Sequence, residues 1–168
     1  MRVALIAALA LAGPAHAEVK STTDSGFRLE NRVTVNATPE RAWTALGEIG
    51  RWWNSDHTYS GDALNMTLPL KVGGCFCEAL PGGGVEHGRV IVAWPEQKLL
   101  RLQAALGPLQ DEGVEAVLTF QIKPAPGGAE IVQTYNVGGV RPEMLKNAPL
   151  IDQVVGEQLN RLKAYLQP

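Results

Sequence analysis

The chain has 168 residues, 45% of them hydrophobic, with 15 Lys and Arg against 17 Asp and Glu and a formal net charge of −2. This profile fits one globular domain and excludes collagenous, low-complexity and disordered chains. The slight acidic excess leaves no overall basic field to hold a phosphate backbone, so nucleic acid is not expected as a partner.

The N-terminus has the features of a secretory signal peptide. Met1 and Arg2 precede an apolar run from Val3 to Gly13, and Ala15-His16-Ala17 then places small residues at the two positions that a signal peptidase reads. The run is shorter than the roughly 20 residues of a membrane-spanning helix. The sequence therefore predicts a signal peptide over residues 1–17, a secreted or periplasmic protein, and no membrane span in the mature chain.

The next segments predict a loose stretch, a strand and a helix. Residues 18–26 are polar and are expected to be loose. Apolar and polar residues partly alternate from Phe27 to about Asn36, which predicts a strand. Thr38-Pro39-Glu40 predicts a helix start, with a hydroxyl N-cap, a proline at the first helical position and an acid in the first turn. This amphipathic helix is expected to end near Gly50.

The middle of the chain consists of short β-like runs separated by Gly and Pro turns. Turns this close together favour an antiparallel meander, because parallel crossovers need a dozen or more residues each. A last helix is predicted from Asn147 to Leu166, with apolar residues three or four apart. Residues 27–168 are thus expected to form one domain in the order β, α, six β, α. The six runs are ALNMTLPL, CFCEAL, EHGRVIVAW, KLLRLQAAL, VEAVLTFQIK and AEIVQTYNV.

Four features carry further information: the Thr-Pro-Glu helix start, Trp52-Trp53, Gly73-Gly74 at a strand start, and HGRVIVAWPEQKLLRLQ from His87 to Gln103. Together with the order of the elements, they resemble the START-like superfamily, whose members are often labelled SRPBCC domains. The chain looks most like the branch related to activators of the heat-shock ATPase, with polyketide cyclase-like relatives. The resemblance implies an α+β helix-grip fold, in which a curved antiparallel β-sheet wraps around a long C-terminal α-helix and leaves a cavity. Trp94-Pro95 departs from the usual Asp-Pro turn, and a signal peptide departs from the cytosolic co-chaperone role.

Aromatic side chains and histidine gather in the segment RWWNSDHTYSGD. Trp52, Trp53, His57 and Tyr59 are predicted to form a stacking rim with polar handles at the mouth of a small-molecule cavity. Tyr135 shares a mostly apolar strand face and is expected to face the same cavity. The competing interpretation keeps Trp53 in the core and His57 in a surface loop.

Cys75 and Cys77 leave three interpretations open: a strained, redox-active disulfide, a metal site, or two small buried apolar residues. Residues two apart on a strand share a face and lie about 6.6 Å apart, near the upper limit for disulfide Cα atoms. His57 is the candidate third metal ligand, but no fourth ligand has support in the sequence, and structural zinc usually has four.

Glu78 and His87 are the best catalytic candidates. If Gly82-Gly83 forms the tip of a two-residue hairpin, Glu78 pairs with His87 and Cys77 with Gly88, so both sulfurs lie on the opposite face. A carboxylate beside an imidazole fixes its tautomer and raises its basicity, as a general base requires. The competing interpretation is an ordinary cross-strand charge pair on a solvated face.

Three functions follow from these residues. The favoured one is a secreted protein that binds a small, largely apolar or aromatic ligand between sheet and C-terminal helix. The second is a cyclase or dehydratase-type enzyme, with His87 as base, Glu78 orienting it and Tyr135 as acid or oxyanion donor. The third is a redox or metal role for Cys75 and Cys77. No recognisable catalytic, phosphate-loop or dinucleotide motif occurs, so no cofactor is predicted.

Overall fold

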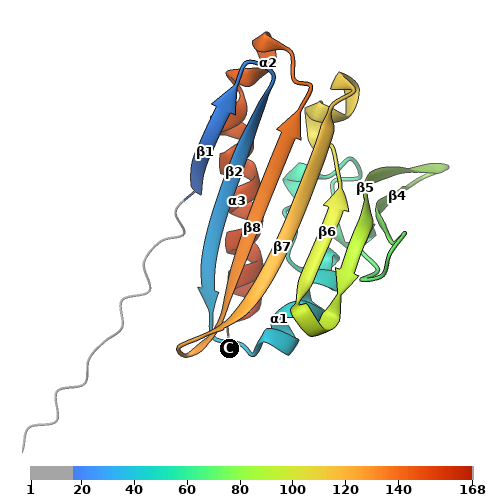
Figure 1. The fold of residues 1–168 in the computed structure, drawn as a ribbon. Coiled ribbons are helices and arrows are strands. Elements are labelled where there is room, and N and C mark those ends of the chain that lie inside the picture. The colour runs from blue at the N-terminus through green and yellow to red at the C-terminus, as the bar shows by residue number, and fades with distance from the viewer. Residues whose placement is uncertain (1–16, 168) are drawn as a thin grey trace, which may run out of the picture.

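The computed structural model describes residues 17–167. In this part of the chain an eight-stranded antiparallel sheet carries a long helix, α3 (Ala148–Tyr165), across one face (Figure 1). The strands lie in the order β1-β2-β8-β7-β6-β5-β4-β3, so the meander from β3 to β8 closes onto the N-terminal pair. Their bounds are β1 Ala17–Thr23, β2 Gly26–Val35, β3 Met66–Thr67, β4 Cys75–Leu80, β5 Gly83–Trp94, β6 Leu99–Gln103, β7 Glu115–Ala125 and β8 Gly128–Gly138.

Most of the predicted elements are confirmed. The first predicted strand corresponds to β2, the six β-like runs overlap β3 to β8 in order, and the helix-grip arrangement is present. Helix α1 (Pro39–Gly47) begins where predicted, because the Thr38 hydroxyl accepts a hydrogen bond of 3.2 Å from the amide of Arg41. A short helix, α2 (Pro142–Leu145), precedes α3.

The expectation of a loose segment over residues 18–26 is wrong for most of its length. Strand β1 pairs with β2, with a shift in register between Val19 and Ser21. It is an edge strand rich in polar residues, so it lacks the hydrophobic period by which a strand is found in a sequence. Helix α3 packs against both β1 and β2, which gives the strand a tertiary support that local sequence does not reveal.

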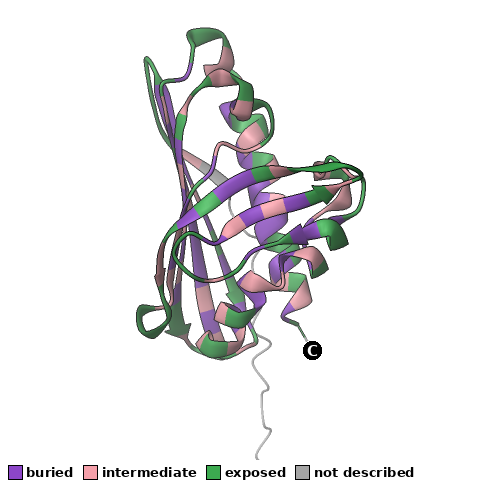
Figure 2. Cartoon of the chain, turned by 90° about the vertical axis from the view of Figure 1, so that its right-hand side faces the viewer, coloured by how far each residue is buried: buried purple, intermediate pink, exposed green. Residues whose placement is uncertain are grey.

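The core lies between the sheet and the helices. Figure 2 shows buried residues on the strands facing buried residues on α3. Val155, Leu159 and Leu162 supply the apolar stripe of α3, at three- and four-residue spacing. The charged residue Asp152 of the same helix is also buried, and its Oδ1 accepts a hydrogen bond of 3.2 Å from Asn31 Nδ2. None of the described helices is long and apolar enough to cross a bilayer.

Candidate ligand-binding site

A cavity of about 360 Å³ lies between α3, the loop after α1, and a segment that follows β6. Its apolar wall comes from the β6 segment and from one side of α3: Leu106, Pro108, Leu150, Ile151, Val154 and Val155. Tyr59 and Leu150 are the exposed large hydrophobic side chains among its lining residues, and they lie where the cavity meets solvent. A mostly apolar, partly enclosed space of this size is typical of a small-molecule site.

The predicted rim segment does border this cavity. Trp53, His57 and Tyr59 are lining residues, together with Asp56 and Thr58. The indole Nε1 of Trp53 donates a hydrogen bond of 3.1 Å to the carbonyl of His57, which folds the loop back over the tryptophan.

The rim loop is also tied to α3. Asn54 Nδ2 donates to Glu157 Oε1 at 2.6 Å, and the amide of Asn54 donates to Gln158 Oε1 at 2.8 Å. His57 Nε2 lies 3.5 Å from Glu157 Oε2. These contacts hold the aromatic rim against the helix that forms the opposite wall.

Glu78 and His87 meet at the wall of the cavity. His87 Nε2 lies 2.9 Å from Glu78 Oε2, both side chains are buried, and His87 lines the cavity. Burial by itself would raise the pKa of Glu78. Hydrogen bonds from Ser60, from the backbone amide of Tyr59 and from His87 outweigh it and hold the pKa below its ordinary value. Glu78 is therefore an ionised acceptor, and the Nε2–H of His87 donates to it.

The hairpin register differs from the prediction, but the predicted faces are preserved. Cys77 pairs with Glu86 and Glu78 with Val85, while Phe76 pairs with Gly88, so His87 is the extra residue of a β-bulge. The tip of the turn is Pro81-Gly82, one residue nearer the N-terminus than predicted, so the partner of Glu78 moves by two residues, from His87 to Val85. A shift of two residues in the partner leaves every side chain on its original face. Glu78 and His87 point inward, as expected.

Glycine is required at the bulge. A Cβ on Gly88 would lie 2.5 Å from the Cβ of Ala104 and 2.8 Å from the carbonyl oxygen of Gln103. The missing side chain lets the bulged part of β5 approach the end of β6 closely. The bulge in turn orients the neighbouring imidazole of His87 toward the cavity.

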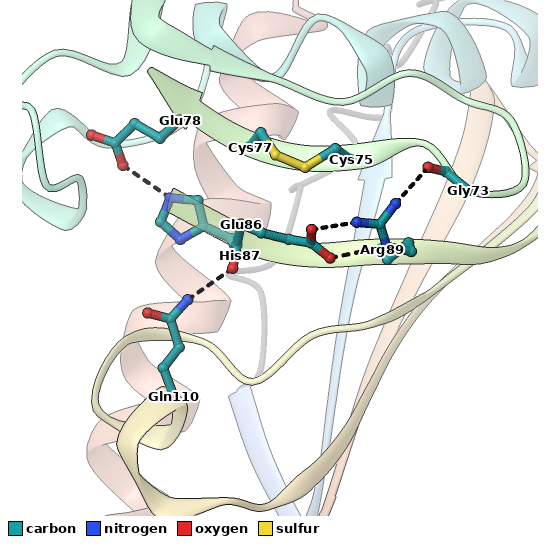
Figure 3. The surroundings of a disulfide bond; sticks show 8 residues. All are labelled: Gly73, Cys75, Cys77, Glu78, Glu86, His87, Arg89 and Gln110. Carbon is teal, nitrogen blue, oxygen red and sulfur yellow. Dashed lines mark hydrogen bonds and ion pairs between the residues drawn. A yellow bond between two sulfur atoms is a disulfide. The ribbon is translucent and has the colours of Figure 1, made fainter. Parts of the chain in front are cut away.

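The two cysteines form a disulfide on the opposite face of the sheet (Figure 3). Their Cα atoms are 5.2 Å apart, closer than the expected 6.6 Å and within the ordinary range. Both residues are half-buried, so they are not a pair of core residues. Their neighbour Glu86 accepts a hydrogen bond of 3.0 Å from Arg89 Nε.

The metal interpretation is not supported with the ligands that were predicted. Within residues 17–167, the group of potential ligands around the two sulfurs includes Glu86 and not His57. A metal would need thiolates, which the disulfide does not offer.

Trp52 and Tyr135, both predicted to line the cavity, lie in the core instead. Trp52 is buried, and its Nε1 donates to the carbonyl of Ala45 at 2.8 Å. The Tyr135 hydroxyl donates to the carbonyl of Ala104 at 2.8 Å and accepts from the amide of Leu106 at 3.0 Å. Burial raises the pKa of Tyr135 far above its ordinary value. Its hydroxyl holds the segment that walls the cavity, and Tyr135 is not itself a lining residue.

Gln158 is a lining residue that sequence reasoning missed. It is fully buried on α3, three residues after Val155 and four before Leu162. A polar residue at an apolar position of a helical pattern is the signal that could have identified it.

Comparison with known proteins gives the fold. No family model matches the chain, and no curated protein does. Solved structures do match, among them a protein from Rhodobacter sphaeroides, with a TM-score of 0.61 and 24% identity over 90% of this chain and 98% of the other. The chain has the START-like, helix-grip fold.

Two further solved structures also match the fold of this chain. The Aha1 dimer from Colwellia psychrerythraea has a TM-score of 0.58 and 19% identity, over 83% of this chain and 96% of the other. Major latex-like protein 151 from Panax ginseng has a TM-score of 0.58 and 10% identity, over 86% and 99%. At these identities the shared property is the START-like fold, as the sequence resemblance implied.

Proposed function

We propose that this protein binds a small, largely apolar molecule in the cavity between the sheet and α3. The observation that carries this proposal is the composition of the cavity wall, which is apolar along α3 and aromatic at Trp53 and Tyr59. Burial of a ligand's apolar surface against such a wall is favourable by about 25 cal/mol per Å². The hydrogen-bonded loop from Asn54 to His57 supplies a preformed rim, which lowers the entropic cost of binding.

Filling the cavity tests this proposal. Val154 lines the cavity from α3 and is half-buried, so Val154→Phe would occupy part of it. Asn160→Phe places the same side chain on an exposed position of the same helix and serves as the matched control. Binding of naphthalene derivatives, followed by tryptophan fluorescence, should weaken at least about tenfold in the first variant and stay unchanged in the second.

Either of two results would overturn the binding function. One is a wild-type protein that binds no member of a panel of naphthalenes and medium-chain fatty acids. The other is equal binding by Val154→Phe and the wild type. Native mass spectrometry of the purified protein should also detect any ligand that copurifies.

We also propose that binding takes place outside the cytoplasm. The support is the signal-peptide pattern of residues 1–17, of which all but Ala17 lie outside the described residues. A disulfide between Cys75 and Cys77 is consistent with an oxidising compartment. Cleavage after Ala17 would leave β1 almost whole.

A cyclase or dehydratase-type enzyme is a second candidate, favoured by the contact of 2.9 Å between Glu78 and His87 at the cavity wall. An ionised carboxylate that holds the imidazole is the arrangement of a general base. The hydrogen bonds of Tyr135 leave this candidate without the acid that the sequence suggested. Turnover of a cyclisable polyketide-type substrate that His87→Gln abolishes would support it, and the absence of turnover in the wild type would remove it.

A further inference from the structure

In the side-chain amide of Gln158 the oxygen has a hydrogen-bond partner, and the nitrogen has none among the described residues. Its Oε1 accepts the hydrogen bond of 2.8 Å from the backbone amide of Asn54, and only an oxygen can accept from an N–H. This contact fixes the orientation of the amide group. Nε2 is buried and has no hydrogen-bond partner among the described residues. Gln158 lines the cavity, and its two amide hydrogens have no acceptor among residues 17–167.

A buried donor without a partner is rare, because its lost hydration is not replaced. In the helix–sheet core an apolar residue at position 158 would avoid that cost. The same residue lies against a cavity large enough for a small molecule, so an acceptor on that molecule can complete the hydrogen bond.

His87 is a second polar residue that lines the cavity. Its Nε2 lies 2.9 Å from Oε2 of the ionised Glu78, so a buried carboxylate lies next to this part of the wall. A buried negative charge at the wall disfavours an anionic group on the ligand. The donor of Gln158 thus points to a neutral acceptor.

We infer that the ligand carries a neutral carbonyl oxygen, as in a ketone, ester or amide, and that this oxygen accepts a hydrogen bond from Gln158 Nε2 while the rest of the molecule lies against the apolar wall. This inference rests on the proposed binding function and narrows the ligand class. The cavity then distinguishes carbonyl compounds from hydrocarbons of the same shape.

Two probes of nearly identical shape test the inference. 2-Acetylnaphthalene and 2-isopropenylnaphthalene differ by a carbonyl oxygen in place of a methylene group. In an apolar cavity without a donor, the acetyl compound binds more weakly because its carbonyl loses water. With Gln158 as donor it should bind about tenfold more tightly than the isopropenyl compound, measured by calorimetry or tryptophan fluorescence. 2-Naphthoate should bind more weakly than 2-acetylnaphthalene.

Gln158→Met removes the donor and keeps the length of the side chain. It also removes the acceptor for Asn54, but the ratio of the two affinities cancels any effect of a looser loop, because the loop contacts both probes alike. The tenfold preference should vanish in Gln158→Met and persist in Gln153→Met, an exposed position on the same helix. If Gln158→Met does not melt cooperatively, Gln158→Glu at mildly alkaline pH keeps an acceptor for Asn54 and removes the donor.

The outcomes separate the inference from the function on which it rests. Equal or weaker binding of 2-acetylnaphthalene by the wild type overturns the inference and leaves the binding function standing. A preference that survives both Gln158 variants also overturns it. If neither probe binds the wild type but another member of the panel does, the inference is overturned and the binding function stands. If no member of the panel binds, both are overturned together.

Discussion

Glu78 and His87 meet at 2.9 Å although they are not partners in the register of β4 and β5. Val85 faces Glu78, and His87 is the extra residue of the bulge. The same carboxylate accepts hydrogen bonds from the amides of Tyr59 and Ser60 in the rim loop. One buried carboxylate therefore connects the hairpin, the rim loop and the imidazole that lines the cavity. Replacing it should affect stability and its dependence on pH.

Glu78→Gln should lower the free energy of unfolding by about 2 kcal/mol at neutral pH, because an amide cannot accept all the hydrogen bonds that the carboxylate accepts. The pKa of Glu78 is lower in the folded protein than its ordinary value of 4.5. The contribution is therefore complete above pH 4.5 and is lost as the pH falls through the folded pKa. Urea denaturation at neutral pH and at about pH 3.5 should show a smaller acid-induced loss in Glu78→Gln than in the wild type.

Glu143→Gln is the control for this experiment, because Glu143 is exposed at the start of α2. Its free energy of unfolding should follow that of the wild type at both pH values. An acid-induced loss of equal size in Glu78→Gln and the wild type would contradict the role assigned to the Glu78 carboxylate.

The features that the sequence predicts correctly depend on residues that are close together along the chain. Thr38 and Pro39 locate the start of α1 because capping involves residues three apart. The shared face of Glu78 and His87 is also predictable, because alternation along a strand survives a register error of two residues. Tyr135 and Gln158 are different. The acceptor of the Tyr135 hydroxyl lies 31 residues away, and the amide bound to Gln158 lies 104 residues away. These long-range contacts form only in the folded protein. The sequence therefore does not show that Gln158 lines the cavity and that Tyr135 does not.

Tyr135→Phe should lower the free energy of unfolding by about 1–3 kcal/mol, because it leaves the buried carbonyl of Ala104 and the amide of Leu106 without their partner. Ligand affinity should also fall, since Leu106 walls the cavity. Tyr59→Phe removes a hydroxyl from an exposed side chain and should change stability by less than about 0.5 kcal/mol. Equal effects of the two substitutions in urea denaturation would contradict the structural role of Tyr135.

The Cys75–Cys77 disulfide should contribute little to stability, because it closes a loop between residues only two apart. Loop-closure entropy for so short a ring amounts to roughly 1.6 kcal/mol, below the usual effect of a native disulfide. The double variant Cys75→Ser, Cys77→Ser should therefore fold and bind naphthalenes as the wild type does. Intact mass should first confirm that the wild type is lighter by two hydrogens than its reduced form. Loss of folding on reduction would contradict this expectation.

Export to the periplasm of a Gram-negative host should remove residues 1–17 and yield a mature protein that begins at Glu18, as read by intact mass or N-terminal sequencing. A signal peptidase reads the small side chains of Ala15 and Ala17, so Ala15→Phe should leave the precursor uncleaved. His16→Phe is the matched control, because the residue between those two positions is not read, and its product should be processed normally. A wild-type product that retains Met1, or equal processing of both variants, would contradict cleavage after Ala17. Correct processing would also leave β1 paired with β2 from Glu18 on, so the mature protein should keep the thermal stability of the full sheet.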